Sequence, residues 1–177
     1  MSIGIQERAE YKEMLAHIVS RFNYIEFQLS AVLIGALGLP KERQDFSYRV
    51  LFNNAIIPFA QKVKLLLNLQ QELGWPGVDA KCFHRLAHIR NQFAHCMPRE
   101  HITINILTDE DRTEAGLIIM LESIDGSGRL KPSSAKNAFE EFGQYDDEVS
   151  KYIRSIKTKK VEQVVDGKPP KAPQPPR

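Results

Sequence analysis

The chain has 177 residues and a formal net charge of +2, with 42% hydrophobic and 26% charged residues. This length predicts a single domain that can bury its own core, and the near-average composition excludes a wholly disordered chain. No apolar run is long enough to span a bilayer, so we expect a soluble protein with no membrane contact. The charge is far from the strongly basic balance of a nucleic-acid-binding domain, so composition alone names no partner.

The N-terminal sequence and the cysteine content predict a cytoplasmic protein. The sequence MSIGIQERAEYKE carries charges where a secretory signal needs an apolar segment. Cys82 and Cys96 are too few for a disulfide framework. We therefore expect a cytoplasmic chain with reduced thiols.

A long amphipathic helix is predicted near the N-terminus. Apolar residues recur every three or four positions over residues 5–37. Gly35, Gly38 and Pro40 accumulate at the end of this pattern, as is typical where a helix stops. The break precedes a mixed segment with the sequence KERQDFSYRVLFNN.

Two more helices are predicted downstream. One begins after Asn53 or Asn54, either of which can cap it, with Pro58 tolerated in its first turn. The other runs over residues 80–94, with Asp79 as its cap. Together with the first helix, they account for the first half of the chain.

The hydrophobic period changes after the third helix. Alternation over residues 101–121, around the polar turn TDEDRTEA, predicts a β-hairpin. A last helix is expected after Ser133 or Ser134, because apolar residues then recur every three or four positions up to Ile156. The sequence therefore predicts a mainly α fold, a bundle of four to five helices with a long first helix and a small β-hairpin before the last one.

The C-terminal end has a different composition. Residues 157–177 contain six Lys or Arg against two acidic residues, a local charge of +4 that leaves −2 for the preceding 156 residues. The last nine residues include five prolines, a composition that does not pack into regular structure. We expect one domain over residues 1–158 and a basic, proline-rich, disordered tail over residues 159–177.

Two charged residues fall inside apolar helix faces. Glu26 lies at the centre of the apolar face of the first helix, and Arg90 lies within that of the third. Burying either charge alone costs several kcal/mol, whereas a hydrogen-bonded pair offsets much of this cost. We therefore predict that Glu26 and Arg90 meet where the two helices pack. The pair either only fixes the helix register or orients Arg90 toward a phosphate.

The residues that follow Arg90 favour the phosphate-binding alternative. Asn91 comes next and His95 lies five positions on, in the sequence RNQFAH. A guanidinium, a neutral amide and an imidazole are the groups that transphosphorylation of RNA needs, with no metal ligand set. Positions i and i+5 of a straight helix diverge by about 140°. Arg90 and His95 therefore converge only if the helix ends early or a second copy supplies one of them.

The RNQFAH motif resembles the signature of the HEPN superfamily, in which an Arg, usually followed by a polar residue, precedes a His by four to six positions. The long first helix with its internal acidic residue, the segment PFAQKVKLLLNL and the final helix suit that fold over residues 5–158. HEPN proteins are commonly metal-independent endoribonucleases of toxin–antitoxin, phage-defence and RNA-processing systems, active as dimers in which two motif copies line one cleft. The layout is also similar to that of the mannitol-repressor-like regulators.

The resemblance implies a catalytic set of Arg90, Asn91 and His95, supported by Glu26. It implies cleavage that leaves a 2′,3′-cyclic phosphate and a 5′-OH, with His95 as acid or base and Arg90 on the phosphate. It also implies a homodimer that acts on RNA or a nucleotide without a cofactor, and an antitoxin protein as a further candidate partner. The alternative is a non-catalytic nucleotide- or RNA-binding or regulatory protein on the same scaffold.

Other residues give weaker signals. His84 and His88 stand four positions apart on one helix, a spacing that can bind zinc, but no Glu or Cys completes a motif, so we expect a solvated polar face and no metal site. Cys96 is interpreted as a partly buried small residue rather than a nucleophile. The basic tail either attracts RNA phosphates or is a linker or docking peptide, and a helical adaptor acting through this tail is a third alternative.

Overall fold

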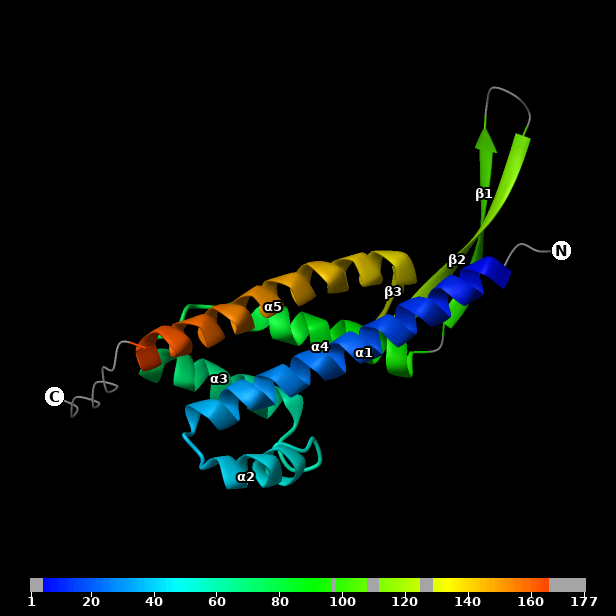
Figure 1. The fold of residues 1–177 in the computed structure, drawn as a ribbon. Coiled ribbons are helices and arrows are strands. Elements are labelled where there is room, and N and C mark those ends of the chain that lie inside the picture. The colour runs from blue at the N-terminus through cyan, green and yellow to red at the C-terminus, as the bar shows by residue number, and fades with distance from the viewer. Residues whose placement is uncertain (1–4, 97, 108–111, 125–128, 166–177) are drawn as a thin grey trace. The chain divides into compact units, whose positions relative to one another are not determined.

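The structure is a computed structural model, and it describes residues 5–96, 98–107, 112–124 and 129–165. The chain is mainly α-helical, with a long first helix and a small antiparallel sheet before the last helix (Figure 1). These features confirm the predicted fold class.

Helices dominate the described part of the chain. The two longest are α1, with 32 residues, and α5, with 31 residues. A short π-helical turn, η1, follows the second helix. The elements in chain order are α1 (Ile5–Ala36), α2 (Lys41–Phe46), η1 (Ser47–Leu51), α3 (Phe59–Leu73), α4 (Ala80–His95), β1 (Pro98–Leu107), β2 (Arg112–Ile124), β3 (Leu130–Ser134) and α5 (Ala135–Val165).

The chain forms two compact units, and each combines two separate stretches of sequence. The first unit contains Met1–Phe22 and Arg85–Tyr145, and the second contains Asn23–His84 and Asp146–Arg177. The boundaries fall inside α1, α4 and α5, so each unit takes a part of these three helices.

In the first unit, aromatic and ionic contacts join α1 to α4 and to the sheet. Tyr11 of α1 stacks on Phe93 of α4 with ring centroids 5.6 Å apart, and its hydroxyl donates to the Phe93 carbonyl oxygen at 3.4 Å. The Arg8 guanidinium donates two hydrogen bonds to the Glu100 carboxylate of β1. The buried apolar side chains of this unit include Ile18, Phe22, Leu86, Ile89, Leu121, Ala138 and Phe142.

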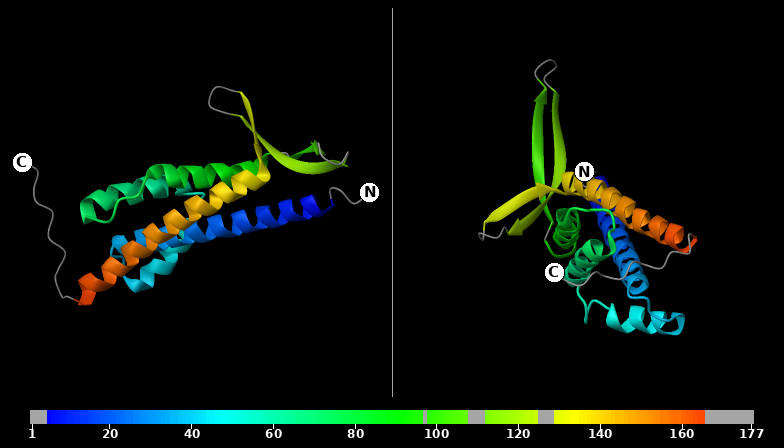
Figure 2. Two further views of the ribbon diagram at one scale, coloured as in Figure 1. Left: turned by 90° about the horizontal axis from the view of Figure 1, so that it is seen from above. Right: turned by 90° about the vertical axis from the view of Figure 1, so that its left-hand side faces the viewer.

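The sheet belongs to the first unit and has the strand order β1-β2-β3. The antiparallel pairing of β1 with β2 runs from Pro98 opposite Leu121 to Leu107 opposite Arg112 and confirms the predicted hairpin, whose turn lies outside the described residues. β3 pairs only with the C-terminal end of β2 (Figure 2). The sequence did not predict β3 because it has five residues and contains Pro132, which argues against a strand.

In the second unit, aromatic side chains join α3, α4 and α5. The Phe83 ring of α4 lies 6.3 Å from that of Phe59 and 6.4 Å from that of Tyr152, between centroids. The Tyr152 hydroxyl donates to Gln70 Oε1 of α3 at 3.2 Å. Burial raises the pKa of Tyr152 to about 12, so this hydroxyl remains a donor at neutral pH. The buried apolar side chains of this unit include Ile25, Leu29, Leu33, Val63, Leu66, Val149 and Ile153.

The start of α3 differs from the prediction. The helix begins at Phe59, directly after Pro58, so neither Asn53 nor Asn54 caps it. Both asparagine side chains bind elsewhere: Asn53 Oδ1 accepts from the Ala55 backbone N–H at 3.0 Å, and Asn54 Nδ2 donates to a carboxylate of α1 at 2.7 Å. The sequence pattern could not separate these roles because Asn favours both caps and turns.

The starts of α4 and α5 follow the prediction. The Lys81 backbone N–H donates to Asp79 Oδ1 at 2.8 Å at the start of α4. The Asn137 backbone N–H donates to Ser134 Oγ at 3.1 Å at the start of α5. Gly74 ends α3 with a φ of 61°, a left-handed conformation that favours glycine.

The C-terminal boundary of the helical part lies further along than predicted. α5 continues to Val165, so residues 159–165, which were expected in the tail, belong to the helix. The Lys, Glu and Gln residues of this stretch are good helix formers, whereas the tail was predicted from the basic charge of residues 157–177 and from prolines that all lie after residue 168. The rest of the predicted tail, residues 166–177, lies outside the described residues.

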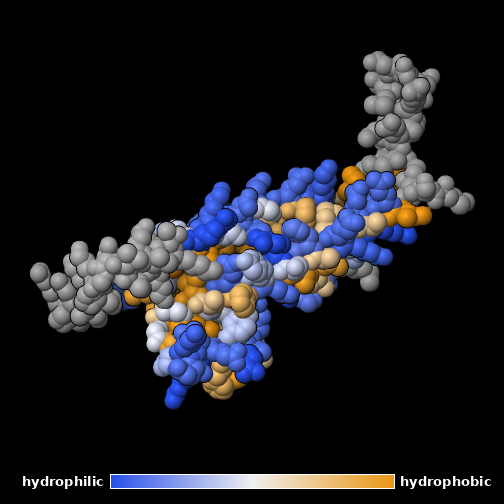
Figure 3. Space-filling model, viewed as in Figure 1, coloured by the Kyte–Doolittle hydropathy of each residue, from blue (hydrophilic) through white to orange (hydrophobic). Residues whose placement is uncertain are grey.

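The surface is mostly hydrophilic, with apolar patches among the polar side chains on the face that Figure 3 shows. None of the helices in the described ranges is both long and apolar enough to cross a membrane. In the second unit, the exposed large apolar side chains include Leu37, Phe46, Val50, Leu51 and Ile56.

Candidate functional site

Helix α4 carries the RNQFAH motif in the first unit. The helix runs from Ala80 to His95 and includes the whole motif. Positions i and i+5 of a continuous helix diverge by about 140°, so Arg90 and His95 project in different directions. The early helix end that could bring them together is therefore absent, and one chain presents these two side chains to different surroundings.

Arg90 packs against α1 within the first unit. Its Cζ lies 5.5 Å from the centroid of the Phe22 ring, and Nη1 donates to Asn91 Oδ1 at 2.9 Å. Its Nε is buried and has no hydrogen-bond partner among the described residues. A buried N–H without a partner costs about 1–3 kcal/mol. The sequence placed Arg90 inside an apolar arc, and the structure gives it an aromatic neighbour there.

An open groove of about 540 Å³ lies between α4 and the sheet of the first unit. Its α4 wall is formed by positions three or four residues apart, which share one face of a helix. The groove brings Asn91 and His95 together, but Arg90 does not line it. The polar and charged lining residues include His88, Asn91, Gln92 and His95 from α4, and Arg99, Glu122 and Ser123 from the strands.

Hydrogen bonds and an ion pair hold the walls of this groove. The buried Gln92 side chain of α4 donates to Ser123 Oγ of β2 at 3.0 Å, and this hydroxyl donates to the Lys131 carbonyl oxygen of β3 at 3.3 Å. Arg99 of β1 pairs with Glu122 of β2, with 2.9 Å between Nε and Oε2. The α4 face is thus fixed to the sheet by side chains that do not depend on a ligand.

His88 is a second imidazole in the groove. Partial burial and the nearby Arg85 guanidinium lower its pKa below the ordinary value, the Glu141 carboxylate of α5 opposes this shift, and Lys131 of β3 adds to it. Arg85 itself is paired with Glu141. These surroundings therefore favour the neutral imidazole of His88, the form that can accept a proton.

The sequence also gave weaker signals at Cys96 and at the pair His84 and His88. Burial raises the pKa of the Cys96 thiol, so the protonated form prevails at neutral pH, and its intermediate exposure confirms the predicted partly buried residue. His84 and His88 are both exposed. Among the described residues, no group of three or more His, Cys, Asp or Glu side chains could hold a metal ion.

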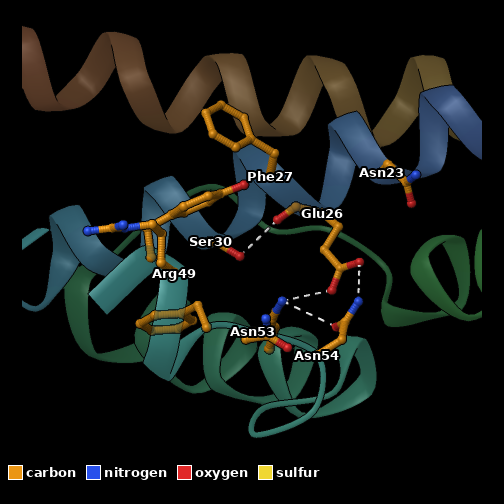
Figure 4. A pocket seen from close by; sticks show the side chains of 10 residues that line it. Asn23, Glu26, Phe27, Ser30, Arg49, Asn53 and Asn54 are labelled. Atoms are coloured by element: carbon orange, nitrogen blue, oxygen red, sulfur yellow. Dashed lines mark hydrogen bonds and ion pairs between the residues drawn. The ribbon is translucent and has the colours of Figure 1, made fainter. Parts of the chain in front are cut away.

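The second unit gives Glu26 a partner that the sequence did not predict. Lys62 Nζ donates to Glu26 Oε1 at 2.7 Å, and Asn54 Nδ2 donates to Oε2 at 2.7 Å (Figure 4). Lys62 Nζ also donates to Asn54 Oδ1 at 3.3 Å. The predicted pairing of Glu26 with Arg90 is therefore wrong, and Lys62 is the counter-charge. Glu26 does not support Arg90 but binds α3 and the loop before it.

The same sequence pattern that revealed Glu26 could have revealed Lys62. On a helical wheel of α3, at 100° per residue, the side chains of Phe59, Leu66 and Leu69 lie within about 60° of Lys62. The charge thus lies at the centre of an apolar arc, as Glu26 does in α1. Two cations, Arg90 and Lys62, therefore lie inside apolar helix faces, and the predicted pairing of Glu26 with Arg90 is wrong because Lys62 is the one that contacts Glu26.

This ion pair lines a cavity of about 370 Å³ in the second unit, which Figure 4 shows from close by. The π-helical turn η1, closed by a hydrogen bond of 2.9 Å from the Phe52 N–H to the Ser47 carbonyl oxygen, contributes Tyr48 and Arg49 to the wall. Burial and the Glu26 carboxylate raise the pKa of Tyr48. The hydrogen bonds of Asn54 to Glu26 and Lys62 fix the loop before α3 against α1.

Comparison with protein-family models, with curated proteins and with solved structures finds no match to this chain. The assignment of a function therefore rests on the groove and on the motif that lines it.

Proposed function

We propose that this protein is a metal-independent endoribonuclease of the HEPN type, which cleaves RNA by transphosphorylation through the ribose 2′-OH. The observation that best supports the proposal is the α4 groove, where His95 and Asn91 share one open surface. His95 is exposed there, and an exposed imidazole in an open groove suits proton transfer to a bound strand.

The proposed reaction forms one bond at phosphorus, to the 2′-oxygen, and breaks one, to the 5′-oxygen, with one proton transfer at each oxygen. The 2′-oxygen attacks the phosphorus and loses its proton to a base, while the bond to the 5′-oxygen breaks and that oxygen gains a proton from an acid. The products carry a 2′,3′-cyclic phosphate and a 5′-OH. His95 is one of the two proton-transfer groups, Asn91 holds a phosphate oxygen, and Arg90 offsets the negative charge that develops on the phosphoryl group.

A homodimer supplies the geometry that one chain lacks. Because Arg90 and His95 diverge on one helix, the proposed site combines His95 of one copy with Arg90 of a second. A two-fold axis brings the same surface patch of both copies together and so creates two equivalent composite sites. RNA is the proposed substrate of this composite site.

The proposal is tested by incubating the purified wild type and His95→Ala with mixed RNA in EDTA, followed by analysis of fragment ends. We expect fragments ending in 2′,3′-cyclic phosphate from the wild type alone. His95→Ala should fold normally, because an exposed residue at a helix end contributes little to stability. Equal cleavage by both proteins would show that His95 takes no part in the reaction and would contradict the proposed mechanism.

A non-catalytic RNA- or nucleotide-binding protein is the alternative function of the same groove. Arg99 favours it, because this guanidinium lies exposed at the groove wall beside its partner Glu122, where a phosphate can compete with the carboxylate for it without any reaction. RNA that binds tightly to the wild type but stays intact, with weaker binding to Arg99→Ala, would favour this alternative.

A further inference from the structure

Three polar side chains stand in a row along the groove face of α4. His88, Asn91 and His95 occupy positions i, i+3 and i+7, which lie on one side of a helix, and all three line the groove. The rise of 1.5 Å per residue separates the backbones of the two histidines by roughly 10 Å. Each imidazole reaches several ångströms from its backbone, so the two rings can approach one phosphodiester from opposite sides.

Asn91 occupies the middle of this row. Its Oδ1 accepts from Arg90 Nη1 at 2.9 Å, which leaves the two N–H groups of its amide as the donors that can face a phosphate oxygen. Its role in the row is therefore to hold the group that stands between the two imidazoles.

Transphosphorylation needs two proton transfers of opposite direction at one phosphodiester. A base must take the 2′-OH proton, and an acid must protonate the 5′-oxygen as it leaves. With a single histidine per chain, the two roles would fall to different copies. The second imidazole in this groove removes that requirement for the proton transfers.

We propose that His88 is a catalytic residue, the general base that removes the 2′-OH proton, and that His95 of the same chain protonates the 5′-oxygen. This inference rests on the proposed ribonuclease function and names a further residue of its site. The charged groups around His88 are Arg85 on α4, Glu141 on α5 and Lys131 on β3, and the facing wall of the groove carries Arg99 and Glu122.

These surroundings suit a base rather than an acid. Partial burial and the cations Arg85 and Lys131 disfavour the protonated imidazole, while Glu141 is already paired with Arg85. A base must be uncharged to act, so activity should rise with pH through the pKa of His88. An acid must be protonated to act, so the loss of its proton gives the profile a descending limb at high pH.

The test compares pH profiles of kcat/KM for RNA cleavage in the wild type, His88→Ala and His88→Gln. We expect a bell-shaped profile for the wild type, a loss of about 10²–10⁴-fold at the optimum in both variants, and loss of the acidic limb only. A merely structural role would lower the whole profile and keep both limbs. His84→Ala is the matched control, since His84 is an exposed histidine of the same helix that does not line the groove.

The outcomes separate this inference from the function on which it rests. If His95→Ala is inactive while both His88 variants keep the wild-type rate and both limbs, His88 is not the base and the ribonuclease proposal stands. If the wild type leaves RNA intact, the ribonuclease proposal and the inference fail together. Circular dichroism spectra that match the wild type verify that each variant is folded.

Discussion

The ion pair between Lys62 and Glu26 is almost removed from solvent, with exposed fractions of 2% and 8%. Such a pair is tolerated only when hydrogen bonds satisfy both charged groups, because desolvation offsets much of the attraction between them. Asn54 provides these bonds by donating to the carboxylate and accepting from the ammonium group. The main effect of the cluster is therefore to disfavour other packing arrangements of the second unit, in which one of the two charges would be buried without its partner.

Removing one charge of this pair should destabilise the protein strongly. Lys62→Met leaves the Glu26 carboxylate buried without its cation, and we expect the free energy of unfolding to fall by about 3–5 kcal/mol. The double variant Lys62→Met, Glu26→Gln should lose less than the sum of the single losses, because no charge is then stranded. Urea denaturation followed by far-ultraviolet circular dichroism measures each value.

Lys64→Met is the matched control for this cycle. Lys64 is an exposed residue of the same helix, so its replacement should change the free energy of unfolding by less than about 0.5 kcal/mol. If Lys62→Met is as mild as Lys64→Met, the buried pair has no energetic importance.

Single residues also show where prediction from the sequence stops. Periodicity placed Glu26 on a buried face, and the structure confirms that it is buried. The partner could not be derived in the same way, because a wheel describes one helix while a contact depends on how two segments pack. Lys62 is 36 positions away and was one of two cations that satisfied the same argument.

At the level of elements, long periodic segments were predicted and short ones were missed. α1, α4 and α5 each repeat an apolar face over several turns, which fixes both the type and the approximate bounds of the helix. α2, η1 and β3 have five or six residues each, too few to display a period. The π-helical turn in particular has no sequence signature, since its hydrogen bond joins Ser47 to Phe52 through the backbone.

The cap of α4 gives an element-level prediction. Asp79→Ala removes the side-chain acceptor of the Lys81 N–H, and we expect a loss of about 1 kcal/mol in the free energy of unfolding. Asp79→Asn keeps an acceptor at the same place and should stay close to the wild type. Thermal and urea denaturation of the two variants provide the comparison. Equal losses in both would mean that the charge, and not the cap, stabilises the helix.

For the whole molecule, the direction of side chains on α4 determines how many chains a complete site needs. The sequence left two ways for Arg90 and His95 to converge, and the continuous helix through His95 removes one of them. The other way, a second copy, is the one on which the proposed function relies. The motif resemblance implied a homodimer, but the sequence could not place the contact between the copies, because such a contact depends on a surface rather than on a period. The composite site is therefore the part of the proposed function that a two-chain experiment tests best.

Mixing two inactive variants should restore ribonuclease activity if the site is composite. In a dimer of one Arg90→Ala chain and one His95→Ala chain, one site combines the intact Arg90 of one copy with the intact His95 of the other, while the second site lacks both. Random exchange of subunits makes half of the dimers mixed, so we expect about a quarter of the wild-type activity, assayed on RNA in EDTA after joint refolding. His88 does not alter this expectation, because the copy that supplies His95 to a site also supplies His88. If two variants that are each folded and dimeric do not recover activity on mixing, either Arg90 and His95 act in the same chain's site or Arg90 has no catalytic role. If activity appears without subunit exchange, one variant was not fully inactive.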